Sequence, residues 1–252
     1  MKRSDLVALL DQLLVPGEVR DYGPNGLQFE GRDEVRRVAL GVTACQALLD
    51  KAAGWDADAV LVHHGLFWGS SAGTRVVRSL RARLARLFEA DMSLLAYHLP
   101  LDRHLEVGNN AVLARRLGAE LVEAAFEMDG ATIGVVARLP EPVALDEMTR
   151  RIARETGRDP LVAAGGPGRV ESFGVVTGRA PDLVGQAALA GLDLFLTGEP
   201  SEPAVHLARE EGIHFVAAGH HATERFGVQA LGAWLEEEAG LETRFFEIPN
   251  PV

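Results

Sequence analysis

The chain has 252 residues, a formal net charge of −11 at pH 7 and 47% hydrophobic residues, which is enough to bury a core as one large domain or two small ones. The acidic charge disfavours nucleic acid as a partner, and no apolar run is long enough to span a membrane. A single cysteine, Cys45, excludes an internal disulfide and a thiolate zinc cage. It indicates a reducing compartment, so we expect the protein in the cytoplasm. Residues 1–5 lead into an amphipathic pattern, not into the apolar core of a signal peptide.

An amphipathic helix is expected first, over residues 4–14, where leucines recur at helical spacing behind the capping residue Ser4. Beyond it, short apolar runs alternate with amphipathic segments. Strands are predicted at residues 35–42, 59–63, 93–97, 173–177, 192–196, 213–217 and 242–248. Helices are predicted at residues 46–54, 75–88, 110–117, 183–190, 204–211 and 226–239. This alternation predicts an α/β fold with mostly parallel or mixed sheets.

The second half of the chain repeats the order of the first. Residues 39–43 resemble residues 173–177, and each segment is followed by a helix, an apolar strand, another helix and a further strand. Residues 119–130 look like a boundary. We therefore predict two pseudo-equivalent α/β lobes, residues 1–126 and 127–252, with a metal site between them.

Histidines are concentrated at the predicted strand ends. The chain has only eight histidines, yet two pairs are adjacent, His63-His64 and His220-His221. Sites in open α/β sheets form at the carboxyl ends of strands. Neighbouring residues of a continuing strand point to opposite faces, so His63 and His64 can reach one pocket only where the strand ends.

The last strand of each repeat leads into a histidine followed four residues later by a carboxylate. These pairs are His98 with Asp102 and His220 with Glu224. On a helical turn, residues at this spacing lie on one face. The same spacing at the same place in both halves supports the pseudo-equivalent arrangement.

Together, four imidazoles and two carboxylates exceed the three protein ligands usual for one catalytic zinc. They suit two ions ~3.5–4 Å apart that share a carboxylate bridge. We therefore expect two divalent metal ions per chain, with Zn as the first choice and Fe, Mn or Co as alternatives, because ligand type alone does not select among them. The expected ligands are His63, His64, His98, Asp102, His220 and Glu224.

Three further residues are candidates for contact with substrate or for support of the ligands. His104, His221 and Glu199 could serve in this way, with a plain surface role as the alternative. The first two are the candidate catalytic residues, because imidazoles move protons near neutral pH. His206 and His214 are instead expected to be hydrogen-bonded core residues.

Three other segments have structural interpretations. Asn109-Asn110 is expected to cap a helix, and residues 165–168 are expected to form a loop. The helix over 75–88 carries an arginine-rich face. This face is either a solvated or subunit-facing surface, which we favour, or a phosphate-binding surface.

The motifs at the strand ends resemble those of the family called GTP cyclohydrolase 1 type 2-like, also described as dinuclear-metal-centre hexameric proteins. The resemblance covers residues 21–251 and points to the short bacterial form. It implies two α/β lobes, a toroidal homohexamer and two metals held by the six residues given above. Against this pattern Leu66-Phe67-Trp68 is bulky, which indicates a pocket wall or a subunit contact. The matching segments are Asn25-Gly26-Leu27-Gln28, Val62-His63-His64-Gly65, Tyr97 to His104, Gly108-Asn109-Asn110, Thr197-Gly198-Glu199 and Gly219 to Arg225.

The leading functional hypothesis is a metal-dependent, cyclohydrolase-like hydrolase that acts on a small molecule, a nucleotide or another phosphoester. Neither a P-loop nor a nucleophile elbow is present in the sequence. The alternative is a non-catalytic protein, a scaffold or a regulatory binding protein, whose metals stabilise the fold and the hexamer. Metal storage is a third, weaker hypothesis.

Overall fold

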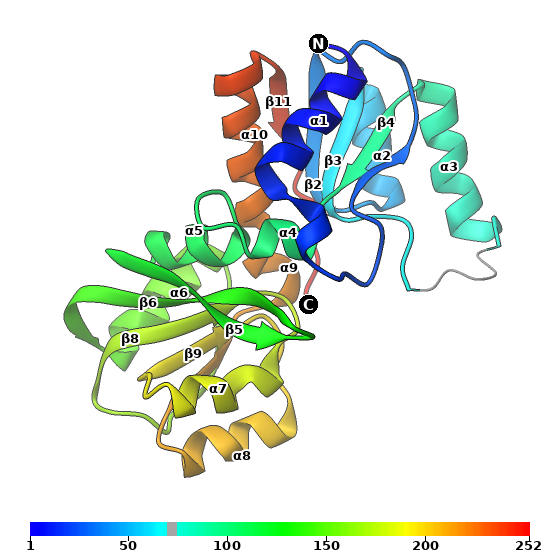
Figure 1. The fold of residues 1–252 in the computed structure, drawn as a ribbon. Coiled ribbons are helices and arrows are strands. Elements are labelled where there is room, and N and C mark those ends of the chain that lie inside the picture. The colour runs from blue at the N-terminus through cyan, green and yellow to red at the C-terminus, as the bar shows by residue number, and fades with distance from the viewer. Residues whose placement is uncertain (70–74) are drawn as a thin grey trace. The chain divides into compact units, whose positions relative to one another are not determined.

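The computed structural model describes residues 1–69 and 75–252, and contacts divide the chain into two compact units (Figure 1). Unit 1 comprises Met1–Leu101 with Gly227–Pro249, and unit 2 comprises Asp102–Phe226 with Asn250–Val252. These units differ from the halves expected from the sequence. Residues 102–126 group with unit 2, and the C-terminal helix and strand return to unit 1.

Unit 1 contains a five-stranded mixed sheet in the order β1-β4-β3-β2-β11. Strands β11, β2, β3 and β4 run parallel, and β1 pairs antiparallel with β4 at the edge. Their bounds are β1 (Gly26–Phe29), β2 (Arg37–Thr43), β3 (Ala59–His64), β4 (Ser93–Ala96) and β11 (Glu242–Phe245).

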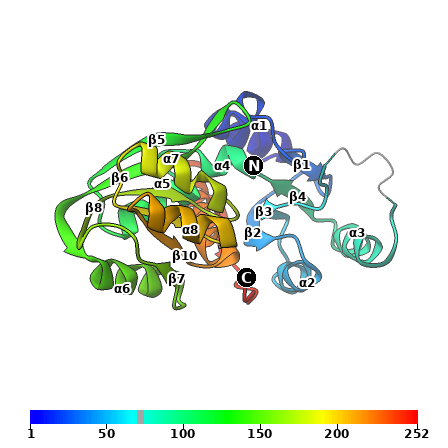
Figure 2. The same ribbon diagram turned by 90° about the horizontal axis from the view of Figure 1, so that it is seen from below.

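Helices cover both faces of this sheet (Figure 2). Alternate residues of a strand point to opposite faces, and β2 shows the consequence. A Cβ on Gly41 would meet the Leu48 side chain of α2, whereas Leu40 approaches Gly232 of α10 from the other side. The helices are α1 (Arg3–Leu14), α2 (Gln46–Gly54), α3 (Arg78–Ala90), α4 (Leu99–Asp102) and α10 (Arg225–Ala239), with the 3-10 turn η1 (Pro16–Glu18).

Unit 2 contains a six-stranded mixed sheet in the order β5-β6-β8-β9-β10-β7. Strands β8, β9 and β10 run parallel, while β6 pairs antiparallel with β8, β5 with β6, and β7 with β10. Their bounds are β5 (Leu121–Met128), β6 (Ala131–Ala144), β7 (Leu161–Ala163), β8 (Arg169–Val176), β9 (Leu194–Thr197) and β10 (His214–Ala217).

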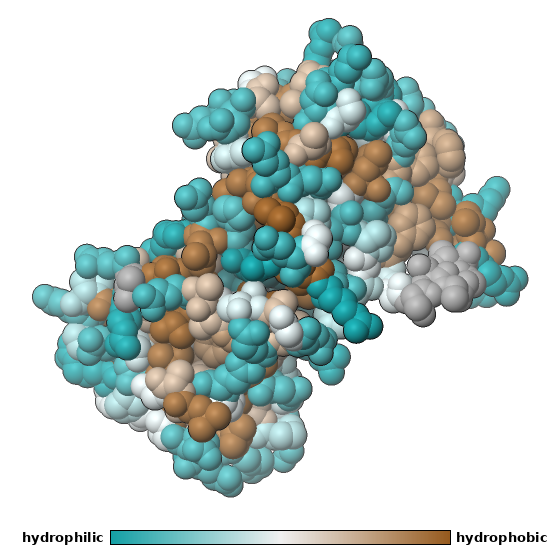
Figure 3. Space-filling model, in the orientation of Figure 1, coloured by the Kyte–Doolittle hydropathy of each residue, from teal (hydrophilic) through white to brown (hydrophobic). Residues whose placement is uncertain are grey.

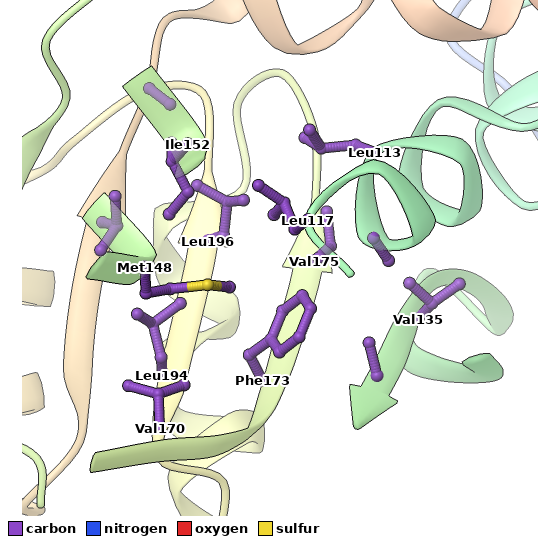
Figure 4. Close-up of a cluster of buried hydrophobic side chains, with 14 of the residues drawn as sticks. Leu113, Leu117, Val135, Met148, Ile152, Val170, Phe173, Val175, Leu194 and Leu196 are labelled. Carbon is purple, nitrogen blue, oxygen red and sulfur yellow. The ribbon is translucent and has the colours of Figure 1, made fainter. Parts of the chain in front are cut away.

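Two helix pairs cover the faces of the second sheet. Helices α5 (Asn109–Arg116) and α6 (Leu145–Thr156) pack Leu113, Met148 and Ile152 onto Phe173 and its neighbours (Figure 4). Burial of each such side chain contributes about 1.5–3 kcal/mol. The other face is covered by α7 (Val184–Leu189) and α8 (Glu202–Glu210). The turn η2 (Pro181–Leu183) precedes α7, and the single helical turn α9 (His220–Thr223) follows β10.

The predicted repeat is present in the topology. The order β1-β4-β3-β2 in unit 1 corresponds to β7-β10-β9-β8 in unit 2. Three strands run parallel in each set. A short strand, β1 in unit 1 and β7 in unit 2, precedes them in the sequence and lies at the edge of the sheet. It pairs antiparallel with the last of the three, β4 or β10. The predicted fold class of two pseudo-equivalent α/β lobes is therefore confirmed.

Several local expectations were wrong. Residues 119–130, expected to be a boundary, lie within unit 2, where β5 occupies most of this segment and pairs along its length with β6. The arginine-rich helix begins at Arg78, not at residue 75, and Arg86 pairs with Asp50 of α2 at 2.8 Å. A pair of this kind is typical of a solvated helix face. The viewed face in Figure 3 carries hydrophilic and hydrophobic residues interspersed on each unit. No helix among the described residues combines the length and apolar character needed to cross a membrane.

Candidate metal centre

Three histidines of unit 1 meet at the carboxyl ends of adjacent parallel strands. His63 and His64 are the last two residues of β3, and His98 follows the end of β4. One nitrogen from each ring lies within 4.8 Å of the others. The ring centroids are 4.8 Å apart for His63 and His64, 4.9 Å for His63 and His98, and 5.5 Å for His64 and His98. Because the strand ends at His64, neighbouring residues can face one site.

Each of these imidazoles has an oxygen beside its Nδ1 atom. His63 Nδ1 donates to the carbonyl oxygen of Tyr97 at 3.0 Å, and His64 Nδ1 lies 3.0 Å from the Thr43 hydroxyl. His98 Nδ1 lies 2.7 Å from an Asp21 carboxylate oxygen. An oxygen acceptor at Nδ1 fixes the ring and favours the tautomer whose lone pair is on Nε2, the atom that ligates a metal.

Asp21 is a residue of the site that the sequence did not identify. Burial raises the pKa of its carboxyl, but the hydrogen bond and charge of His98, together with bonds from Asn25 and the Tyr22 N–H, outweigh burial and lower the pKa. The Leu99 N–H also donates to Asp21, at 2.9 Å. In the sequence, the one signal for Asp21 was its position at the start of the segment that resembles the family.

In unit 2, His220 and Glu224 lie on one face of the turn α9. Their Nε2 and Oε2 atoms are 3.1 Å apart at i,i+4, as predicted for this spacing. His220 Nδ1 lies 2.6 Å from Glu199 Oε1, so this fourth imidazole also has an oxygen at Nδ1. Burial lowers the pKa of His220, but the hydrogen bonds and charges of Glu224 and Glu199 outweigh it and raise the pKa to about 9. Two carboxylates therefore create a strongly cation-attracting position.

The loop after β8 shapes the space around Glu224, whose exposed fraction is only 2%. Gly178 has φ of +67°, and a Cβ at this position would lie 2.2 Å from Glu224 Oε1. Any side chain there would displace the carboxylate, so a glycine is required. The Gly178 N–H donates to the Thr223 hydroxyl at 3.2 Å, which ties the loop to α9.

Asp102 is also buried, and two asparagines hold it. Asn109 donates to Asp102 Oδ1 at 2.8 Å, and Asn110 donates to the Asp102 carbonyl oxygen at 3.0 Å. Asn110 also accepts the Thr177 N–H at 2.7 Å. The expectation that this pair caps a helix was wrong. Gly108 is the N-cap, no side chain caps the helix, and both asparagines are fully buried around Asp102.

The two candidate proton-transfer residues also belong to unit 2. His104 Nδ1 accepts the N–H groups of Glu106 and Val107, both at 3.2 Å, which leaves Nε2 as the nitrogen that can carry a proton. His221 is half-buried and directly follows His220, and its backbone N–H donates to the Val252 oxygen at 3.0 Å.

The two histidines expected in the core differ from one another. His214 is buried and accepts the Gly166 N–H at Nδ1, 3.1 Å away, while Nε2 donates to the Pro167 oxygen at 2.7 Å, as expected for a structural histidine. His206 does not belong to the core. Its side chain is 63% exposed on α8 and pairs with Glu202 at 3.1 Å.

The residues present fit divalent metal ions. Imidazoles with an oxygen at Nδ1 in both units, and the buried carboxylates of unit 2, offer the ligand types that Zn, Mn, Fe or Co accept. The three nitrogens of unit 1 alone match the number that a catalytic zinc takes from a protein. The fold and the side chains thus define an α/β protein with a candidate metal centre at the carboxyl ends of its strands.

Comparison with known proteins agrees with this class. The family model described as Duf34/NIF3 (NGG1p interacting factor 3) matches residues 1–251, and the chain belongs to this family. A Pseudomonas aeruginosa protein named GTP cyclohydrolase 1 type 2 homolog is 49% identical over 250 residues, which cover 99% of this chain and 98% of the relative. The resemblance noted from the sequence is therefore confirmed.

Two solved structures share the fold over their whole length. One, titled protein ybgI of unknown function, has 43% identity and a TM-score of 0.94, with 100% of both chains covered. The other, the protein TTHA1606 from Thermus thermophilus, has 39% identity and a TM-score of 0.88, again with 100% of both chains covered.

Proposed function

We propose that the chain holds two divalent metal ions, Zn in the first instance, and acts as a metal-dependent hydrolase on a nucleotide or another phosphoester. The proposed ligands come from both units. Unit 1 supplies His63, His64 and His98, and unit 2 supplies Asp102, His220 and Glu224.

The observation that carries this proposal is the shared environment of the four imidazoles. Each has an oxygen at 2.6–3.0 Å from Nδ1, supplied by a carbonyl, a hydroxyl or a carboxylate. Histidines that ligate metals almost always bond their second nitrogen in this way. Four such histidines at strand ends are difficult to explain by packing alone, since His214, the structural histidine, uses both ring nitrogens on one loop.

A second observation concerns where the chain passes between the units, at 101/102, 226/227 and 249/250. Asp102 is the first residue after one crossing, and Glu224 lies two residues before another. Two of the proposed ligands therefore lie beside the segments that join the units, where metal binding would restrain the chain. Such binding favours the native state and raises stability by mass action.

The residues can be assigned roles in hydrolysis. Divalent ions at such a centre supply Lewis-acid polarisation and lower the pKa of water. Asp21 and Glu199 orient His98 and His220, and Asn109 orients Asp102. We assign proton transfer to His104 and His221, since imidazoles exchange protons near neutral pH. The relatives' printed name, GTP cyclohydrolase 1 type 2 homolog, is the reason to test guanine nucleotides first.

The test is a hydrolysis screen of the Zn- and Mn-loaded protein against GTP, GMP and p-nitrophenyl phosphate, with product analysis. We expect turnover that chelator removes and added metal restores. The variants His104→Gln and His221→Gln should lower turnover while metal content is unchanged. Absence of metal-dependent turnover on all three compounds would contradict the hydrolase assignment.

A second candidate function is a non-catalytic, metal-stabilised scaffold or regulatory binding protein, and the coincidence of ligands with chain crossings favours it. On either function we propose a homohexamer located in the cytoplasm, as the family resemblance and the single cysteine suggest. The scaffold function predicts that chelation dissociates the assembly and that the intact, metal-loaded assembly shows no turnover. Sedimentation velocity with and without chelator measures this directly.

A further inference from the structure

Two aromatic side chains of unit 1 remain exposed beside the imidazole cluster. Trp68 is 43% exposed and Tyr22 is 49% exposed. The Trp68 ring lies 5.2 Å from that of His98, at 88°, and 5.7 Å from that of His64. The Tyr22 ring lies 6.2 Å from that of His98. Aromatic rings bury large areas when they are used for packing, so an exposed pair beside candidate metal ligands indicates a ligand contact.

Hydrogen bonds, not burial, hold this pair in place. The Trp68 indole N–H donates to the Gly65 carbonyl oxygen at 3.1 Å. The Gly69 N–H donates to the carbonyl oxygen of Tyr22, which joins the two aromatic loops. The Trp68 ring and the backbone of both loops are therefore held before any ligand arrives, and this lowers the entropy cost of binding.

Gln28 fixes the start of the same loop. Its Oε1 accepts the Leu66 N–H at 2.8 Å, and its Nε2 donates to the Pro24 oxygen at 2.7 Å. A Cβ on Gly65 would lie 2.3 Å from the Gln28 amide, so the glycine permits this close approach. The bulky segment Leu66-Phe67-Trp68 is thus held by hydrogen bonds at a position beside His64.

The chemistry of the pair limits what it can recognise. Because the Trp68 N–H is already bonded, the indole offers its ring face and its apolar edge. Such a surface binds flat aromatic rings by stacking, and it does so for any base because every nucleobase has a π-face. A phosphate or a sugar has no aromatic ring, so stacking on the indole adds little to its affinity.

We propose that Trp68, with Tyr22 beside it, stacks on the heteroaromatic ring of the substrate and selects phosphoesters that carry such a ring over those that lack one. This inference rests on the proposed function, because it places the ring next to the residues assigned to the metal. It makes Trp68 a specificity-determining residue of the same site.

The experiment is a calorimetric titration of the Zn-loaded, full-length protein with guanosine 5′-monophosphate, with ribose 5-phosphate as the probe that lacks a base. Tryptophan fluorescence is followed as a second readout in the proteins that retain Trp68. The variants are Trp68→Phe, which keeps a stacking ring, and Trp68→Leu, which keeps only apolar bulk. Tyr22→Leu tests the second ring. Trp55→Phe is the matched control, because Trp55 packs against Phe246 and under Arg37, away from the imidazoles.

We expect the nucleotide to quench Trp68 fluorescence in the wild-type protein and in Trp55→Phe. Since stacking contributes about 1–3 kcal/mol per base, Trp68→Leu should bind the nucleotide about tenfold more weakly or worse, and Trp68→Phe within about threefold of wild type. Affinity for ribose 5-phosphate and metal content should be the same in all proteins.

Equal nucleotide affinity in Trp68→Leu and wild type would overturn the inference, and so would an absence of nucleotide binding to the wild type. A loss of assembly mass in Trp68→Leu without a change in nucleotide affinity would identify a subunit contact instead. Should Trp68→Leu fail to fold, Tyr22→Leu and Trp68→Phe still test the proposal. Quenching without any turnover would refute only the hydrolase assignment, whereas turnover with unaltered Trp68→Leu affinity would refute only the stacking role.

Discussion

Glu199→Gln tests whether the oxygens at Nδ1 serve metal binding. Glu199 Oε1 lies 2.6 Å from His220 Nδ1, and both side chains are only 27–28% exposed. The substitution keeps the size of the side chain but replaces an ionised acceptor with a neutral amide, which weakens a charge-assisted bond. Loss of such a second-layer partner typically lowers metal affinity about 10- to 100-fold, or about 1.4–2.8 kcal/mol. We expect an effect in this range.

Competition with a chelating dye at fixed pH measures the Zn affinity of the variant. The matched control is Glu202→Gln, because Glu202 pairs with His206 at 3.1 Å, in the same unit but on an exposed helix face. The control should bind Zn as the wild type does, since exposed pairs contribute little. If Glu199→Gln bound Zn within about twofold of wild type, the interpretation of the Nδ1 contacts as support for metal ligands would be refuted.

Three other outcomes are expected. Asn110→Ala should lower the free energy of unfolding by about 1–3 kcal/mol in urea titrations, because it leaves the Thr177 N–H and the Asp102 oxygen without a buried partner; an unchanged midpoint would contradict this. In chelator-treated protein, the pKa of His220 is about 9 when folded, above its ordinary value of 6.5. Its contribution to stability is therefore complete below pH 6.5 and is lost as the pH rises through 9. The contribution is the difference in the free energy of unfolding between the wild type and His220→Gln, measured in urea at about pH 6, 7.5 and 9. This difference should decline as the pH rises, and a constant difference would refute the expectation. Light scattering should give a mass near six times 27.1 kDa, and a monomer at micromolar concentration would contradict the hexamer.

Much of the fold could be predicted, because apolar runs and helical spacing are strong local signals. Helix α2 was predicted with its observed bounds, and β3 to within one residue. Strand β7 has only three residues. Strand β1 is as long as β4, but it begins with Gly26 and contains Gln28, so it lacks the apolar run that identified β4. Strands β5 and β6 were missed because mixed polar and apolar residues, with Pro140 and Pro142 near the end of β6, conceal their alternation. The unit boundaries depend on the return of α10 and β11 to the first sheet, which no local pattern encodes.

The candidate site was predictable where residue type alone points to chemistry. The imidazoles at strand ends and the i,i+4 spacing of His220 and Glu224 could be predicted in this way. Residues that act through others were not predictable, because Asp21 and Asn109 are typical turn and cap residues in sequence. Their roles follow from contacts across 77 and 7 positions of the chain, which only the fold creates.

The most direct test of the central claim is the number of metal ions per chain, measured by elemental analysis of gently purified and Zn-reloaded protein. We expect two ions in the wild type and in His206→Ala, whose histidine lies on the exposed face of α8. Asp102→Ala and Glu224→Ala should each lose most of the bound metal while circular dichroism stays that of the wild type. One ion or fewer after reloading, or an equal loss in His206→Ala, would contradict a dinuclear centre built from these six residues.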